Sequence, residues 1–102
     1  MSKDNPAQGH RINIELGEEM APGTYANATV VTHSGSEFVF DFVRVVPGVP
    51  KAKVVERIIM AAPNAKAFMK TLEQNMQKFE SMHGEIAVKA SQTLVPGSDL
   101  PS

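Results

Sequence analysis

The chain has 102 residues and a net charge of −1, with 42% hydrophobic and 21% charged residues, the balance of an ordinary single globular domain. It contains no cysteine, which excludes disulfides, thiolate metal sites and a cysteine nucleophile. No apolar run reaches the roughly 18 residues of a membrane helix, and the first residues show no hydrophobic signal region, so we expect a cytoplasmic protein. The near-neutral charge predicts no strong overall attraction to nucleic acid or to anionic membranes.

Two polar ends flank the part of the sequence with periodic patterns. Residues 1–10 include Pro6 and Gly9, and residues 87–102 mix Ser, Pro and Gly with scattered apolar residues. Such composition is typical of flexible segments. We therefore predict a flexible N-terminal arm over residues 1–10, a single domain over residues 11–86 and a flexible C-terminal tail over residues 87–102.

Four strands are predicted within the domain. In residues 12–16, Ile and Leu alternate with Asn and Glu, which is the period of a half-buried strand. Residues 24–33 and 37–46 are rich in β-branched and aromatic residues, and the polar residues 34–36 between them predict a tight hairpin. The PGVP stretch over residues 47–50 predicts a wide turn before a fourth strand over residues 53–61.

One long helix is predicted after the fourth strand. Pro63 suits the first turn of a helix, and Gly84 is a natural stop. Between them, apolar residues recur at spacings of three and four: Ala65, Phe68, Met69, Leu72, Met76 and Phe79. The element order β-β-β-β-α with short connections predicts an α+β fold, a four-stranded antiparallel sheet with one long C-terminal helix packed on one face.

The strand over residues 37–46 predicts self-association. Its three phenylalanines share one face, yet the opposite face is also largely apolar, which a solvated face should not be. We therefore expect a homodimer or a higher homo-oligomer. The candidate interface residues are Val39, Asp41, Val43, Val45 and Arg57.

Asp41 stands out within that candidate interface because a carboxylate among apolar neighbours needs a partner. Arg57 or Lys53, both on the next predicted strand, is the expected partner. The pair is either an interstrand ion pair on a partly wet face or a contact that sets the register of a subunit interface.

The sequence offers weak candidates for chemistry. The seven glycines are isolated and form no phosphate-binding loop, and His10, His33 and His83 lie too far apart for a local metal site. A hydrolase interpretation would take Ser34 or Ser36 as nucleophile and His33 as base, but hairpin neighbours rarely converge as a triad requires. Turn chemistry explains these residues better. We expect no catalytic residue, no metal, no cofactor and no enzyme.

Charge is unevenly distributed along the chain. Residues 42–70 carry a net charge of +5, from six Lys or Arg against Glu56 alone, whereas residues 1–41 carry −4. A possible basic patch consists of Arg44, Lys51, Lys53 and Arg57. Because stacking aromatics are missing and the total charge is near neutral, pairing of acidic with basic surfaces is favoured over nucleic-acid binding.

The span from Ile12 to Ile86 resembles a small family of bacterial and archaeal proteins, the domain of unknown function number 3467. The match is carried by INIEL, by TYANATVVTHSGSEFVFDF and by PGVPKAKVVERIIMAAPNAKAF, and it closes with LEQNMQKFE and HGEI. The resemblance covers about three-quarters of the chain and implies a single domain of this size. It implies no activity and no site residues. A weaker, topological likeness is to the subunit of the SecB export chaperone, an oligomer that holds unfolded clients, and this is a likeness of fold alone.

Taken together, these patterns favour a small non-enzymatic interaction protein that self-associates. Two alternatives stay open. A SecB-like chaperone or peptide-binding module would use an adaptable surface of Met69, Met76 and Met82, although methionines on a helix more often fill a core. A nucleic-acid-binding accessory protein would use the basic patch.

Overall fold

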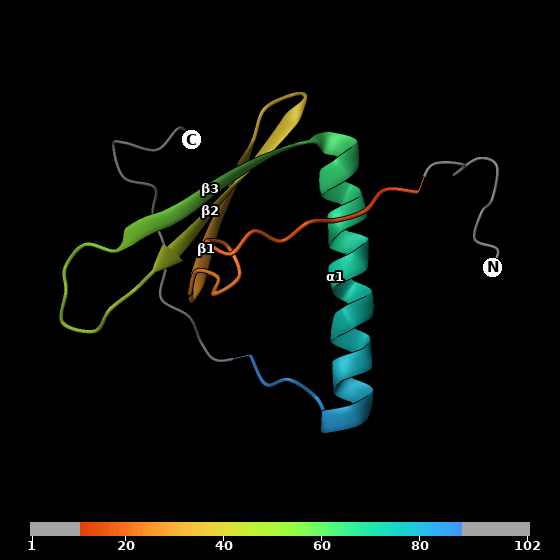
Figure 1. Cartoon of the computed structure of the whole chain (residues 1–102). Coiled ribbons are helices and arrows are strands. Elements are labelled where there is room, and N and C mark those ends of the chain that lie inside the picture. The colour runs from red at the N-terminus through yellow and green to blue at the C-terminus, as the bar shows by residue number, and fades with distance from the viewer. Residues whose placement is uncertain (1–10, 89–102) are drawn as a thin grey trace.

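The computed structural model describes residues 11–88, which form a three-stranded antiparallel sheet and one long helix (Figure 1). In chain order the elements are β1 (Ala28–His33), β2 (Glu37–Arg44), β3 (Lys53–Ala61) and α1 (Ala62–His83). The sheet order is β1-β2-β3, so each strand pairs with its neighbour in sequence. The predicted α+β fold with a C-terminal helix is confirmed, but the sheet has three strands and not four. The predicted arm over residues 1–10 and most of the predicted tail over residues 87–102 lie outside the described residues.

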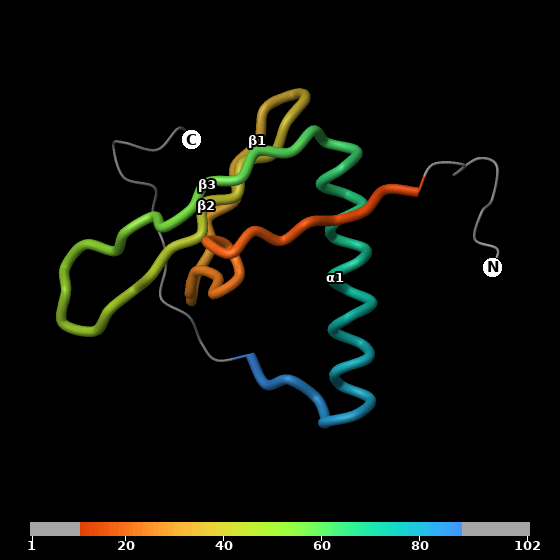
Figure 2. The backbone as a smooth tube through the Cα atoms, viewed as in Figure 1, coloured from red at the N-terminus to blue at the C-terminus, as the bar shows by residue number. Residues whose placement is uncertain are grey.

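Residues 12–16 are the predicted strand that the structure does not form. Their three apolar side chains are strongly exposed, at 82% for Ile12, 93% for Ile14 and 69% for Leu16. The segment leads from the beginning of the sheet toward the side on which α1 stands (Figure 2). Alternation shows which side chains favour burial, but a strand also needs an edge to pair with, and segment 12–16 pairs with no strand of the described chain.

The two connections within the sheet form as the sequence predicts. In the first, the Ser34 backbone N–H donates to the Glu37 carbonyl at 2.9 Å, which closes the hairpin between β1 and β2. In the second, Val49 N–H donates to the Val46 carbonyl at 3.1 Å, and Gly48 adopts a φ of 83°. Proline at the second turn position and glycine with positive φ at the third are the signature of a type II turn.

The helix meets the sheet near its own beginning. Ala62 N–H donates to the Ser36 carbonyl at 2.9 Å, Ala65 is buried, and the Phe68 ring meets the Phe40 ring edge-on at 5.8 Å. Beyond this region α1 diverges from the strands (Figure 1). At the other end, Gly84 N–H donates to the Glu80 carbonyl at 2.9 Å with a φ of 94°, so the predicted helix stop is confirmed.

Candidate interaction surface

The two faces of the sheet differ in what covers them. The register pairs Val31 with Phe40 and Phe40 with Ile58, so these residues form a row on the face toward α1. Val30, Asp41 and Arg57 form the corresponding row on the opposite face. Each face of the sheet therefore has its own environment.

On the face away from α1, Asp41 is fully buried and is held by Arg57. Arg57 Nε donates to Asp41 Oδ1 at 2.6 Å and Arg57 Nη2 donates to Asp41 Oδ2 at 3.0 Å. This two-pronged geometry is the strongest form of the Arg–carboxylate contact, and the hydrogen bond to Asp41 raises the pKa of Arg57. Of the two expected partners, the structure places Arg57 on Asp41. The pair joins the central strand β2 to the edge strand β3 across their ladder.

The predicted interface around Asp41 stays a prediction. Asp41 and Val43 are already buried within one chain, at 0% and 5% exposure, and Val39 and Val45 are half-buried. Much of the apolar surface that one copy leaves exposed lies elsewhere, including on α1 and on segment 12–16.

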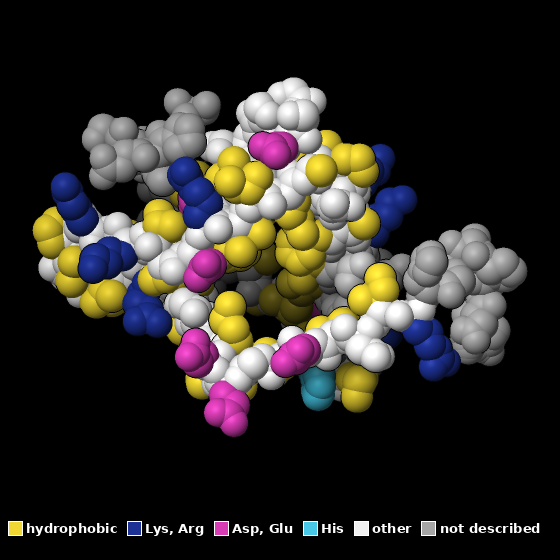
Figure 3. Space-filling model, turned by 45° about the horizontal axis from the view of Figure 1, so that its top comes forward, with side chains coloured by type: hydrophobic (Ala, Val, Ile, Leu, Met, Phe, Trp, Pro, Cys, Tyr) yellow, Lys and Arg dark blue, Asp and Glu magenta, His cyan; other side chains and the backbone are white. Residues whose placement is uncertain are grey.

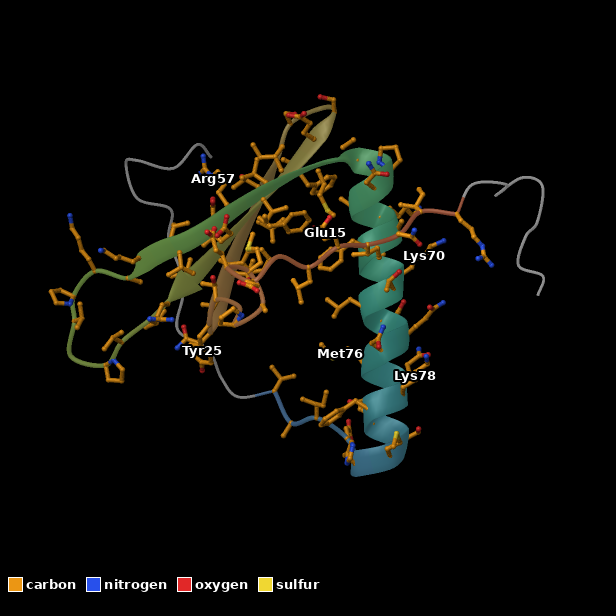
Figure 4. The ribbon with its side chains drawn as sticks, in the orientation of Figure 1. Glu15, Tyr25, Arg57, Lys70, Met76 and Lys78 are labelled. Carbon is orange, nitrogen blue, oxygen red and sulfur yellow. The ribbon has the colours of Figure 1, made fainter. Side chains whose placement is uncertain are left out.

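The apolar side of α1 is largely uncovered. We define the α1 stripe as Phe68, Met69, Leu72, Met76, Phe79 and Met82, whose exposed fractions range from 39% to 75%. In Figure 4, Met76 points from α1 toward the sheet side, whereas Lys70 and Lys78 point the other way. The helix is thus amphipathic as predicted, but its apolar side faces open space over most of its length.

The open space between α1 and the sheet is a hollow of about 550 Å³. Val31, Phe38 and Phe40 line it from the sheet, and Ala65, Phe68 and Leu72 line it from the helix. Hydrophobic side chains surround the hollow in Figure 3. An ordinary protein interior has no unfilled space of this size, since interiors pack as densely as organic crystals. The hollow could not be predicted from the sequence, because periodicity identifies the apolar side of a helix but not the surface that covers it.

The predicted basic patch is only partly assembled. Arg44 and Lys53 are register partners at one end of the sheet, with Lys51 in the adjoining turn. Arg57 lies further along β3 and is neutralised by Asp41. Arg44 also donates to the Tyr25 carbonyl at 3.3 Å and lies 5.8 Å from the centre of the Tyr25 ring. Three of the four predicted cations therefore share one end of the sheet.

The predicted turn chemistry of the hairpin is confirmed at Ser34. Its hydroxyl accepts the backbone N–H of Ser36 at 3.3 Å and that of Glu37 at 3.2 Å, while the His33 ring lies 5.3 Å from the Phe38 ring. His83 likewise lies against Phe79, with ring centres 4.8 Å apart. Within residues 11–88, no three His, Asp or Glu side chains gather as a metal site would require.

In the described part of the chain, no helix has both the length and the hydropathy to cross a bilayer. A family model described as a protein of unknown function, DUF3467, matches residues 1–88. No curated protein and no solved structure matches the chain significantly. The topological likeness to SecB therefore stays a prediction.

Proposed function

Given that the chain belongs to the DUF3467 family of proteins of unknown function, we propose that it is a non-enzymatic protein-interaction domain that self-associates through the α1 stripe. The observation that carries the proposal is the exposure of that stripe. Among residues 11–88, the only buried apolar side chains are Val43 and Ala65, whereas all six residues of the α1 stripe are exposed. Burial of apolar surface is the main driving force of folding, so one copy alone lacks an adequate core.

The exposed area fits what a subunit interface needs. At roughly 200 Å² for a large apolar residue, the exposed fractions of the α1 stripe amount to about 600 Å². A standard interface takes about 800 Å² from each partner. The stripe therefore supplies most of one subunit's share. A second copy presents the same stripe, so two helices packed side by side would cover each other with one symmetric contact.

A pair of matched variants tests this proposal. Leu72→Glu places a charge in the middle of the α1 stripe, whereas Gln74→Glu adds the same charge about half a helical turn away from it. By light scattering after size-exclusion chromatography, we expect Leu72→Glu to have half the mass of the wild type or to unfold, and Gln74→Glu to keep the wild-type mass. A Leu72→Glu protein that keeps both the wild-type mass and the helical circular dichroism signal would contradict the proposal.

The hollow favours one other function, that of a peptide-binding module. An apolar groove of about 550 Å³ beside an uncovered helix is a site in which an extended apolar segment of another protein would fit. The two functions differ in the state of the free protein. A monomer at every concentration that binds a hydrophobic dye would favour peptide binding, whereas a dimer without dye binding favours self-association.

A further inference from the structure

Segment 12–16 has the sequence of a strand but no strand partner within the described chain. We propose that in the dimer it pairs, antiparallel, with the free edge of β3 in the second copy, so that each sheet gains its fourth strand from the partner. This inference rests on the proposed self-association and adds which segment is exchanged and where it binds.

The β3 edge is the better acceptor of the two sheet edges. Eight of the nine strand residues from Lys53 to Ala61 are apolar or basic, none is proline, and Ile58 and Ile59 are 39% and 55% exposed. On β1, by contrast, every second residue is already half-buried. A long apolar edge strand is a template for pairing with another chain.

The backbone groups of β3 are arranged for such pairing. Ala62 N–H bonds the Ser36 carbonyl, and hydrogen-bonded residues alternate along an antiparallel ladder. Ile58 and Met60 therefore bond β2, while the N–H and C=O groups of Arg57 and Ile59 point to the free edge. These four groups are the donors and acceptors that an added strand needs.

One register satisfies the side chains on both faces. With the partner's Ile14 opposite Ile58, the row Val31–Phe40–Ile58 on the helix face gains a fourth apolar residue. The partner's Leu16 then lies near a second hollow, of about 250 Å³, lined in part by Phe42 and Ile58.

On the other face, the same register places the partner's Glu15 opposite Arg57. The Arg57 side chain keeps 34% exposure although it holds Asp41, so a second carboxylate can reach it. An antiparallel direction also brings the partner's Glu18 and Glu19 toward Lys51 and Lys53. The acidic residues after the added segment would thus lie near the basic residues at the beginning of β3, and this charge complementarity would help to fix the register.

The geometry of one copy argues against the same contact within a chain. Figure 4 shows Glu15 between the sheet and α1, while Arg57 lies at the outer side of the sheet. The exchange also completes the interface, because the exposed fractions of Ile12, Ile14 and Leu16 add about 500 Å² to the α1 stripe. Together they exceed the roughly 800 Å² that each partner contributes to a stable complex.

Disulfide cross-linking tests the exchange cleanly, since the natural chain has no cysteine. Full-length Ile14→Cys and Ile58→Cys proteins are mixed and mildly oxidised. Ile14 and Ile58 would be a non-hydrogen-bonded pair, whose Cα atoms lie about 4.5 Å apart, within the range of a disulfide. The matched control mixes Ile14→Cys with Thr29→Cys, an exposed position on the same face of the β1 edge.

We expect the 14–58 disulfide between chains to form about tenfold faster than the 14–29 disulfide, because the paired strands hold the thiols at a high effective concentration. Equal rates, or faster 14–29 linkage, would overturn the exchange. So would a double variant, Ile14→Cys with Ile58→Cys, that closes its disulfide within one chain. The mass of the reduced variants separates the two proposals: a dimer without the 14–58 linkage would leave self-association standing and remove the exchange.

Discussion

The centre of the sheet and the helix α1 differ in which side chains they bury. On β2, the carboxylate Asp41 is fully buried beside Val43, whereas on α1 the large apolar residues from Phe68 to Met82 are exposed by 39% to 75%. In most folded proteins apolar side chains are buried and charged ones are exposed, since charged groups are costly to bury and apolar groups gain from burial. The sheet centre is packed within one chain, whereas under the proposed self-association a second copy covers α1.

Substitutions at the sheet centre should act on each chain by itself, whereas substitutions on α1 should act through association.

The largest effect is expected at the Asp41–Arg57 pair. Arg57→Met would leave a fully buried carboxylate without its partner, and removing one member of such a pair is strongly destabilising. Asp41→Asn leaves an arginine that still reaches solvent, so we expect a smaller loss, about 2 kcal/mol of unfolding free energy. Urea denaturation of both variants shows which of them loses more unfolding free energy. An Arg57→Met protein as stable as Asp41→Asn would show that the carboxylate is not buried in the folded protein.

Phe68→Ala tests how much of α1 is covered in the folded protein. Burial within one copy is partial, since Phe68 is 39% exposed, and the expected loss from its contacts with Phe40 and the sheet is about 2 kcal/mol. A second copy that covers the ring raises the loss to about 3–5 kcal/mol, the range for a fully buried phenylalanine. Measurement of the unfolding free energy at two protein concentrations determines this loss. A loss near the lower figure, the same at both concentrations, would break the proposed difference between sheet and helix.

Gly84→Ala is expected to have a moderate effect that does not depend on association. Gly84 has a φ of 94° and a ψ of 166°, a backbone conformation that residues with a side chain rarely adopt. A Cβ added there would meet no neighbouring atom. The cost is therefore conformational, about 1–2 kcal/mol. Thermal unfolding should show a lower midpoint with unchanged oligomeric mass. A Gly84→Ala protein with an unchanged unfolding midpoint would mean that α1 ends at another residue.

The smallest effect is expected for Ser34→Ala in the hairpin. The hydroxyl accepts two backbone N–H groups, but the turn is exposed and water can replace it. We expect a loss of about 0.5–1 kcal/mol. Urea denaturation checks it, with Ser36→Ala as the control because the Ser36 hydroxyl is not the acceptor in this turn. Equal losses for both variants would show that the hydroxyl of Ser34 has no special place in the turn.

Local patterns predicted the local elements. The β-branched and aromatic runs identified β1, β2 and β3, and Pro63 and Gly84 marked the ends of α1, since each signal depends on the backbone of the residues that carry it. A cationic partner for Asp41 on the next strand, either Arg57 or Lys53, was predicted because a carboxylate inside an apolar strand requires one, and the structure shows Arg57.

What the patterns could not provide is the identity of the covering surface. Residues 12–16 and the α1 stripe both show the periodicity of half-buried elements, and in one copy both are exposed. Periodicity reports that a side chain favours burial and is silent on whether the partner belongs to the same chain. The hollow between α1 and the sheet could not be predicted for the same reason.

Sedimentation equilibrium of the full-length wild-type protein over a hundredfold dilution series tests the central claim most directly. If a second copy covers the α1 stripe, the mass at high concentration is twice that of one chain and falls toward one chain only as the protein dissociates. A folded protein that sediments with the mass of a single chain at every concentration would contradict the claim, because the α1 stripe would then be stable in water.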